Sequence, residues 1–153
     1  MHGRKFQEAE PLLRGALKEG CRLEGLEEPF TLLVMHELAD CLAGLDTKGA
    51  ASEAKEVYRR CMRLRTKLLG STSEATLLTM SNLAQLHLRT AEYGEAEPLL
   101  RRVYKAKRDS LGADHRDSDA SLLALGDCLM EQVVRSWTSG NGCLGYFHAG
   151  EHS

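Results

Sequence analysis

The fold is decided by YGEAEPLLRR, residues 93–102, because this stretch occurs more than once in the chain. Residues 6–14 read FQEAEPLLR, and a diverged copy, SEAKEVYRR, occupies residues 52–60. The matching alanines of the three copies, Ala9, Ala54 and Ala96, are 45 and 42 residues apart. Periods of about 20–50 residues are typical of solenoids and other repeat arrays. The sequence therefore predicts a repeat protein.

Each copy begins with a long helix. The residues three, four and seven positions after each alanine are apolar or small, and this spacing places them on one face of a helix. A glycine stands sixteen positions after each alanine: Gly25, Gly70 and Gly112. Glycine tolerates the left-handed conformation that ends helices, so all three long helices are predicted to stop at the same place.

A second helix follows in each copy. It starts near Thr31, Thr76 and Ser118, and its centre carries a leucine followed by a small residue: Leu38-Ala39, Leu83-Ala84 and Leu125-Gly126. Small residues at fixed positions let two helices approach closely. The predicted helices cover residues 5–24, 30–43, 51–69, 74–89, 93–111 and 117–134. The fold class is all-α, with consecutive helices packed as stacked antiparallel hairpins.

The last part of the chain breaks the period. Residues 1–134 form the repeat array, whereas residues 135–153 contain the glycine-rich stretch SWTSGNGCLG at 136–145 and are predicted to be a disordered, non-repeat tail. Both ends of the array leave apolar helix faces uncovered, and terminal repeats normally carry polar caps. We therefore expect a piece of a longer array, or a truncated variant, that could associate end to end.

Composition favours a cytoplasmic protein. The formal net charge is −2, with 42% hydrophobic and 27% charged residues, so nothing global indicates binding to nucleic acid or membranes. No run approaches the roughly 18 apolar residues of a membrane helix. The five cysteines are odd in number and form no CxxC pair, which argues against a disulfide framework or a zinc site and favours a reducing compartment.

The repeat resembles tetratricopeptide repeats of the long, roughly 42-residue kind found in kinesin light chains and nephrocystin-like proteins. The resemblance covers residues 3 to about 132 and is carried by Asn82-Leu83-Ala84, by the stretch 93–102 and by Leu111-Gly112-x-x-His115. It implies a short right-handed α-solenoid. The chain departs from the family at Arg116, where proline is usual, at Ser73-Glu74, which replaces His-Pro, and at Glu37 and Ala124, which stand where Asn82 would repeat.

The sequence indicates no catalytic, cofactor-binding or metal-binding residues. The only neighbouring His–acid pairs are His36-Glu37 and Asp114-His115, and no serine or cysteine stands at a motif spacing from them. We interpret His115 as a helix-entry residue. Cys41, Cys61 and Cys128 occupy repeat positions that hold leucine, alanine or valine in other copies, and we interpret them as small core residues.

Binding is the better hypothesis. In this family the first helix of each pair lines a concave groove, and in the family's pairing the first helices are those predicted here for residues 30–43, 74–89 and 117–134. The groove positions map onto ten residues: His36, Glu37, Asp40, Ser81, Asn82, Gln85, Arg89, Leu123, Asp127 and Glu131. Asn82 is the strongest candidate, because an amide can donate to and accept from a peptide backbone. The alternative is that it is merely a solvated helix residue.

The groove positions carry four acidic residues against Arg89, so a partner peptide of basic or mixed charge is expected. A solvated acidic surface is the alternative interpretation. The opposite face is basic, with Arg59, Arg60, Arg63 and Lys67 recurring as Arg101, Arg102, Lys105 and Arg108. We expect it to be a solubilising surface.

Two functions remain open. The first is a non-catalytic interaction module, a scaffold or adaptor that binds an extended peptide or a helix in the groove. The second is a structural or regulatory segment of a larger multidomain protein, or an end-to-end self-assembling fragment, without a peptide ligand of its own. Repeat architecture provides a surface without identifying the partner.

Overall fold

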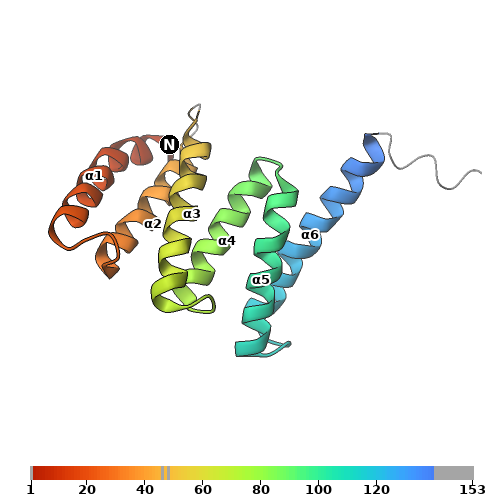
Figure 1. Ribbon diagram of the computed structural model, residues 1–153. Coiled ribbons are helices and arrows are strands. Elements are labelled where there is room, and N and C mark those ends of the chain that lie inside the picture. The colour runs from red at the N-terminus through yellow and green to blue at the C-terminus, as the bar shows by residue number, and fades with distance from the viewer. Residues whose placement is uncertain (1, 46, 48, 140–153) are drawn as a thin grey trace, which may run out of the picture. The chain divides into compact units, whose positions relative to one another are not determined.

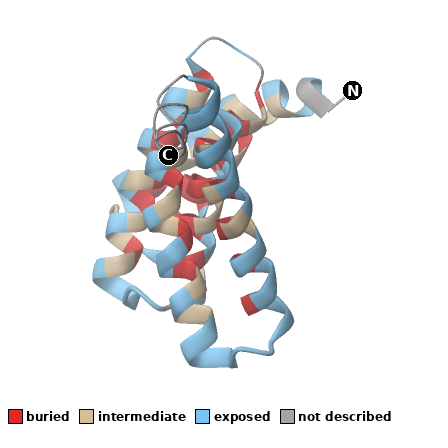
Figure 2. Cartoon of the chain, turned by 90° about the vertical axis from the view of Figure 1, so that its right-hand side faces the viewer, coloured by how far each residue is buried: buried red, intermediate tan, exposed pale blue. Residues whose placement is uncertain are grey.

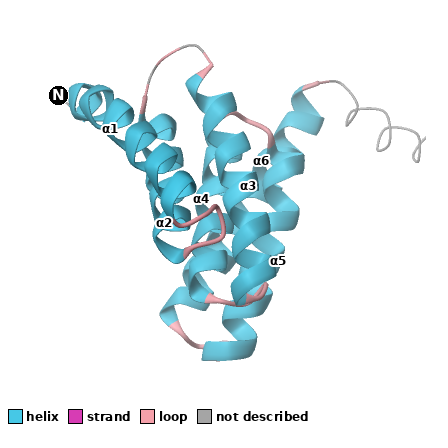
Figure 3. Cartoon of the chain, turned by 60° about the vertical axis from the view of Figure 1, so that its left-hand side comes forward, coloured by secondary structure: helices cyan, strands magenta, loops and turns pink. Residues whose placement is uncertain are grey.

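The computed structural model describes residues 2–45, 47 and 49–139, which form helices and no strand (Figures 1 and 3). The helices are α1 (His2–Leu23), α2 (Pro29–Gly44), α3 (Ala50–Leu69), α4 (Glu74–Arg89), α5 (Tyr93–Leu111) and α6 (Arg116–Thr138). The predicted all-α fold of helical hairpins is confirmed, and the predicted helices are all present. The chain divides into two compact units, Met1–Thr90 and Ala91–Ser153.

The first unit contains α1 to α4. Helix α2 packs against both α1 and α3, and α3 packs in turn against α4. Buried and exposed residues alternate along the helices of the chain (Figure 2). Its core includes Leu38 and Leu83, which are 2% and 1% exposed, and the small residues Ala39 and Ala84, both 0% exposed. The leucine–alanine pairs therefore lie at helix contacts, as the repeat predicts.

Two of the three alanines that define the repeat are fully buried core residues. Ala54 in α3 and Ala96 in α5 are both 0% exposed. Ala9 in α1 is only half-buried. Within the part of the chain that the structure describes, α2 is the main packing partner of α1, and α1 packs less extensively against other helices than α2 or α3 does. The first copy is therefore less well covered than the second.

The glycines after the long helices take the predicted conformation. Gly25, Gly70 and Gly112 have φ values of +102°, +92° and +96°. In the second and third copies, a hydroxyl six residues after the glycine donates a hydrogen bond to the glycine carbonyl. Thr76 donates to Gly70 O at 2.9 Å, and Ser118 donates to Gly112 O at 2.8 Å. These bonds close the link between the two helices of each pair.

Two helix starts are capped by side chains. Ser73 Oγ accepts the backbone N–H of Thr76 at 3.3 Å, and Nδ1 of His115 accepts the backbone N–H of Asp117 at 3.1 Å. Such caps satisfy backbone donors that have no partner within the helix. The interpretation of His115 as a helix-entry residue is confirmed.

The second unit is the hairpin of α5 and α6. Ala96, Leu100 and Val103 of α5 are buried, as are Leu125 and Cys128 of α6. Gln132 of α6 donates to Tyr93 O at 3.2 Å and to Glu97 Oε2 at 3.0 Å. Hydrogen bonds from Gln132 and from Arg101 lower the pKa of the Glu97 carboxyl.

Helix α6 continues beyond the expected array boundary at residue 134 and ends at Thr138. The guanidinium of Arg135 lies 4.8 Å from the centre of the Tyr93 ring, and Ser139 N still donates to Arg135 O at 2.9 Å. This contact with α5 holds the extra turn. The predicted disordered tail falls mainly on residues 140–153, which lie outside the described residues. None of the described helices is long and apolar enough to cross a membrane.

Candidate functional site

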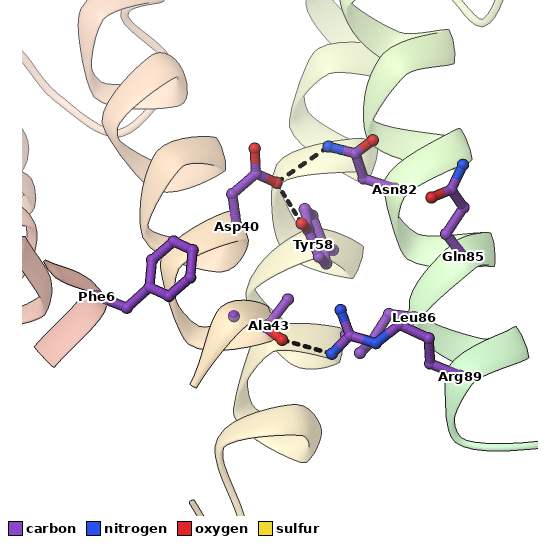
Figure 4. Close-up of a pocket in the computed structure, with 9 residues that line it drawn as sticks. Phe6, Asp40, Ala43, Tyr58, Asn82, Gln85, Leu86 and Arg89 are labelled. Atoms are coloured by element: carbon purple, nitrogen blue, oxygen red, sulfur yellow. Dashed lines mark hydrogen bonds between the residues drawn. The ribbon is translucent and has the colours of Figure 1, made fainter. Parts of the chain in front are cut away.

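A pocket of about 300 Å³ opens in the first unit, on the side formed by α2 and α4 (Figure 4). Four helices contribute to it. It is lined by Phe6 of α1, by Asp40, Ala43 and Gly44 of α2, by Tyr58 of α3, and by Asn82, Gln85, Leu86 and Arg89 of α4. We call this side of the unit the α2–α4 face, defined by Glu37, Asp40, Asn82, Gln85 and Arg89.

Asp40 is the polar centre of the pocket. Its Oδ1 accepts the hydroxyl of Tyr58 from α3 and the side-chain amide of Asn82 from α4, the latter at 3.0 Å. Figure 4 shows both side chains directed at this carboxylate. Tyr58 is 2% exposed, and burial, together with the carboxylate, raises the pKa of its phenol. The phenol therefore stays protonated and acts as a donor.

His36 lies beneath Asp40 and is only 3% exposed. Thr79 Oγ1 donates its proton to Ala75 O at 2.9 Å and accepts from Arg65 Nη1 at 2.7 Å, so towards His36 Nδ1, 3.4 Å away, it can only accept. On this pattern of hydrogen bonds we assign the proton of the neutral His36 ring to Nδ1. Burial lowers the pKa of His36, against the opposing effect of Asp40, so the ring is neutral and Nε2 is an acceptor.

Asn82 uses its amide protons inside the protein. Its Nδ2 lies 3.4 Å from Nε2 of His36 and 3.0 Å from Oδ1 of Asp40, and both of these atoms are acceptors. The two N–H groups can therefore satisfy His36 and Asp40 at the same time. What Asn82 offers to the pocket is its carbonyl oxygen, an acceptor.

The pocket lining also includes a cation and an aromatic ring. Arg89 donates through Nη2 to the carbonyl of Ala43, near the end of α2. Phe6 reaches across from α1 to Gly44, where an added Cβ would lie 2.5 Å from Cε2 of the ring. Gly44 is the residue that lets this ring pack against α2. Asp40 and Arg89 thus place opposite charges in one small pocket.

The structure brings four of the ten predicted groove residues into this pocket: Asp40, Asn82, Gln85 and Arg89. Glu37 is exposed and Ser81 half-buried on the same two helices. His36 differs from the expectation, because its ring faces Tyr58 with the ring centres 5.8 Å apart and is not on the surface. Leu123, Asp127 and Glu131 are exposed on α6 of the second unit.

Tyr58 and Phe6 line the pocket but are not among the ten residues expected from the sequence. Tyr58 stands at a packing position that holds leucine in the other copies, and its hydroxyl was the available signal, because a buried phenol needs a partner. Phe6 occupies the repeat position of Tyr93. Nothing in the periodicity indicates that its ring would reach a pocket.

The cysteines follow the packing interpretation. Cys41, Cys61 and Cys128 are buried free thiols, and burial raises the pKa of each, so the thiols stay protonated. Cys21 is exposed, and Cys143 lies outside the described residues. Among the described residues no group of three or more His, Cys, Asp or Glu side chains is placed to hold a metal ion.

Known repeat proteins are similar to this chain in both sequence and fold. Residues 47–109 match the tetratricopeptide repeat family model. A crystal structure from Podosopora anserina, described as a kinesin light chain with nearly identical TPR-like repeats, is 25% identical with a TM-score of 0.74. It is matched over 84% of this chain and 59% of its own length. No curated protein matches the sequence.

A second solved structure, BtubC (BKLC) from P. vanneervenii, is 16% identical with a TM-score of 0.74, over 97% of this chain and 62% of its own. That likeness shows the fold alone. The chain spans about 60% of the length of these two structures. Over residues 47–109 the chain therefore matches a tetratricopeptide repeat, and its fold is similar to that of solved kinesin light chain-like repeat structures.

Proposed function

We propose that the chain is a non-catalytic protein–protein interaction module that binds an extended peptide or a helix on its α2–α4 face. Tetratricopeptide folds generally mediate protein–protein interaction and are typically non-catalytic, which supports the proposal. The single observation that carries it is the pocket of about 300 Å³, in which side chains from four helices place donors, acceptors and an aromatic ring around an open space.

The charges of the face favour a partner of basic or mixed charge. Glu37 is exposed, and the side chain of Asp40 is 39% exposed, whereas Arg89 is the cation on the same face. Complementary charge increases the rate of encounter and sets the register of a bound peptide. We infer that the module acts in a scaffold or adaptor protein of the cytoplasm, and its buried free thiols are in keeping with a reducing compartment.

The experiment is selection of random peptides against the purified chain, followed by affinity measurements on variants. Gln85→Glu changes an exposed residue that lines the pocket, and Arg60→Glu is the matched control on an exposed residue of α3 outside the pocket. We expect Gln85→Glu to change the affinity of the selected peptides and Arg60→Glu to leave it unchanged. Peptides that respond only to Arg60→Glu would place the binding surface elsewhere. Tighter binding of acidic than of matched basic peptides would contradict the charge preference.

The second candidate is a structural segment that associates through α6. Leu123, Met130, Val134 and Trp137 are 66%, 62%, 49% and 64% exposed, and their spacing puts them on one side of this helix. An apolar row of this kind is usual where a repeat meets its neighbour. Light scattering after size exclusion separates the candidates: concentration-dependent dimers that disappear with Met130→Glu support self-association, and monomers at all concentrations argue against it.

A further inference from the structure

We propose that the pocket between Asp40 and Phe6 receives the cationic side chain of a lysine or arginine of the partner peptide. This inference rests on the proposed function, because it names the group that the α2–α4 face recognises. It follows from two features of the pocket: which hydrogen-bond donors are already bonded within the protein, and which acceptor oxygens remain for a ligand.

Among the residues that the structure describes, the hydrogen bonds to the Asp40 carboxylate go to one of its two oxygens. Oδ1 takes the hydroxyl of Tyr58 and an N–H of Asn82. Nε2 of His36 lies 3.5 Å from Oδ2 and is itself an acceptor in the tautomer assigned from the Thr79 hydrogen bonds. With its single proton assigned to Nδ1, neutral His36 gives Oδ2 no proton, so this oxygen retains its lone pairs for a donor from outside.

Asn82 adds a second acceptor beside the first. Because its N–H groups face His36 and Asp40, its carbonyl oxygen is the part of the amide that remains for a ligand. Two acceptors, one of them negatively charged, match a guanidinium or an ammonium group, which carry only donors. The same end of the pocket would repel a carboxylate.

The remainder of the pocket can accommodate the methylene groups of a lysine or arginine side chain. Phe6 supplies an aromatic wall, against which the methylene groups of lysine or arginine can pack and over which the cation is attracted. A volume of about 300 Å³ lies at the small end of the range for ligand pockets, which suits one side chain better than a folded segment. Tyr58 and His36 act as positioning residues, because they hold the carboxylate and the amide in place from below.

The positive charge of Arg89 disfavours a cation bound close to it. Its Nη2 is tied to the carbonyl of Ala43, so its charge stays at the far end of the pocket. The arrangement therefore selects a cation near Asp40 and favours an acidic or carbonyl group of the peptide near Arg89. Removal of the Arg89 charge should strengthen binding of a simple cation.

The test uses the full ¹⁵N-labelled chain and two small probes, the N-acetyl methylamides of arginine and of citrulline, which is a neutral isostere of arginine. NMR titration follows the side-chain amide of Asn82 and the backbone amide of Gly44. We expect saturable shifts with the arginine probe and none with citrulline at the same concentration. Equal binding of the two probes would overturn the inference.

Two variants make the test specific. Asp40→Asn should weaken arginine binding about tenfold or more. Asp127→Asn is the matched control, since Asp127 occupies the same repeat position on α6, lies in the second unit and is exposed. Should Asp40→Asn not fold, as judged by circular dichroism, Arg89→Met decides: tighter binding of arginine supports the inference and weaker binding overturns it. Equal losses in Asp40→Asn and Asp127→Asn also overturn it.

The outcomes separate this inference from the proposed function. Selected peptides that bind the α2–α4 face without a basic residue would leave the proposed function standing and overturn the lysine or arginine pocket. Specific binding of the arginine probe at Asp40, with no peptide bound by the chain, would support the pocket chemistry and overturn the proposed function.

Discussion

Asn82 of α4 donates an amide N–H to Oδ1 of Asp40 on α2, across 3.0 Å and between residues that are 42 positions apart in the sequence. The bond joins α2 and α4, the shorter helices of two successive copies of the repeat. The same amide lies 3.4 Å from Nε2 of the buried His36. The residue that the family resemblance marked for ligand binding therefore also connects two repeats, so changes at Asn82 should affect stability as well as binding.

Asn82→Ala should lower the free energy of unfolding by about 1–3 kcal/mol, because it removes the donor to a charged carboxylate and leaves buried Nε2 of His36 without that donor. Urea unfolding at neutral pH measures the change. Gln85→Ala is the control three residues along the same helix; its exposed side chain should contribute within about 0.5 kcal/mol. Equal effects of the two substitutions would contradict a structural role for the Asn82 amide.

Tyr58→Phe should also destabilise the protein, by about 1.5–3 kcal/mol, because it removes the phenol that donates to the Asp40 carboxylate and keeps the packed ring. The control is Tyr104→Phe, since Tyr104 is half-buried, its hydroxyl interacts with the exposed Arg108 and with no buried carboxylate that the structure describes, and its ring contact with Arg108, at 5.7 Å from the ring centre, is kept. Thermal and urea unfolding should both place Tyr58→Phe below Tyr104→Phe. A Tyr58→Phe variant as stable as the wild type would show that the bond contributes nothing net.

The buried His36 makes stability depend on pH. Its pKa is lowered in the folded state by burial, from an ordinary value of 6.5, so the unfolded chain binds the proton more readily. Stability from this residue is present above pH 6.5 and is lost as the pH falls from there towards the folded-state pKa. Unfolding free energies between pH 7.5 and pH 5 should show this decline, and His36→Gln should reduce the slope. An unchanged slope in the variant would assign the decline to other groups.

The helices and most of the core could be predicted from the sequence, because a repeat reports the same packing rule three times. Ala54 and Ala96, the leucine–alanine pairs and the glycines after the long helices all lie as the spacing requires. Local rules were enough for these features. The core positions follow from the helical spacing of apolar residues, and the helix ends follow from the backbone conformation that glycine allows.

The pocket could be predicted only in part. Helical phase put Asp40, Asn82, Gln85 and Arg89 on one face, but it does not fix which way a side chain turns. His36 and Glu37 are sequence neighbours, yet His36 is buried against Tyr58 while Glu37 is exposed. The roles of Tyr58 and Phe6 depend on contacts between helices far apart in the sequence. Such contacts leave no signal in the period of any one helix.

Gly44→Ala should disturb the pocket by displacing Phe6. A methyl group at Gly44 would lie 2.5 Å from Cε2 of the ring, so the ring or α1 must move, at a cost of about 1–3 kcal/mol. Gly15→Ala is the control in the interior of α1, where an added Cβ meets nothing within 4 Å. That variant should be more stable than the wild type by about 0.5–1 kcal/mol. Chemical denaturation of the two variants should give opposite signs, and a stabilised Gly44→Ala would contradict the contact.

Two threonines at the same repeat position should respond in opposite ways to valine. Thr31 and Thr76 are both 0% exposed, but Thr76 Oγ1 donates to Gly70 O at 2.9 Å whereas Thr31 Oγ1 has no hydrogen-bond partner among the described residues. A buried hydroxyl without a partner lowers stability, so Thr31→Val should be neutral or stabilising, by up to about 1–2 kcal/mol. Thr76→Val loses a bond that closes the link between α3 and α4 and should destabilise by about 1–2 kcal/mol. Because both changes are alike in size and burial, their difference in urea unfolding isolates the hydrogen bond. Equal losses in the two variants would mean that Thr31 has a partner after all.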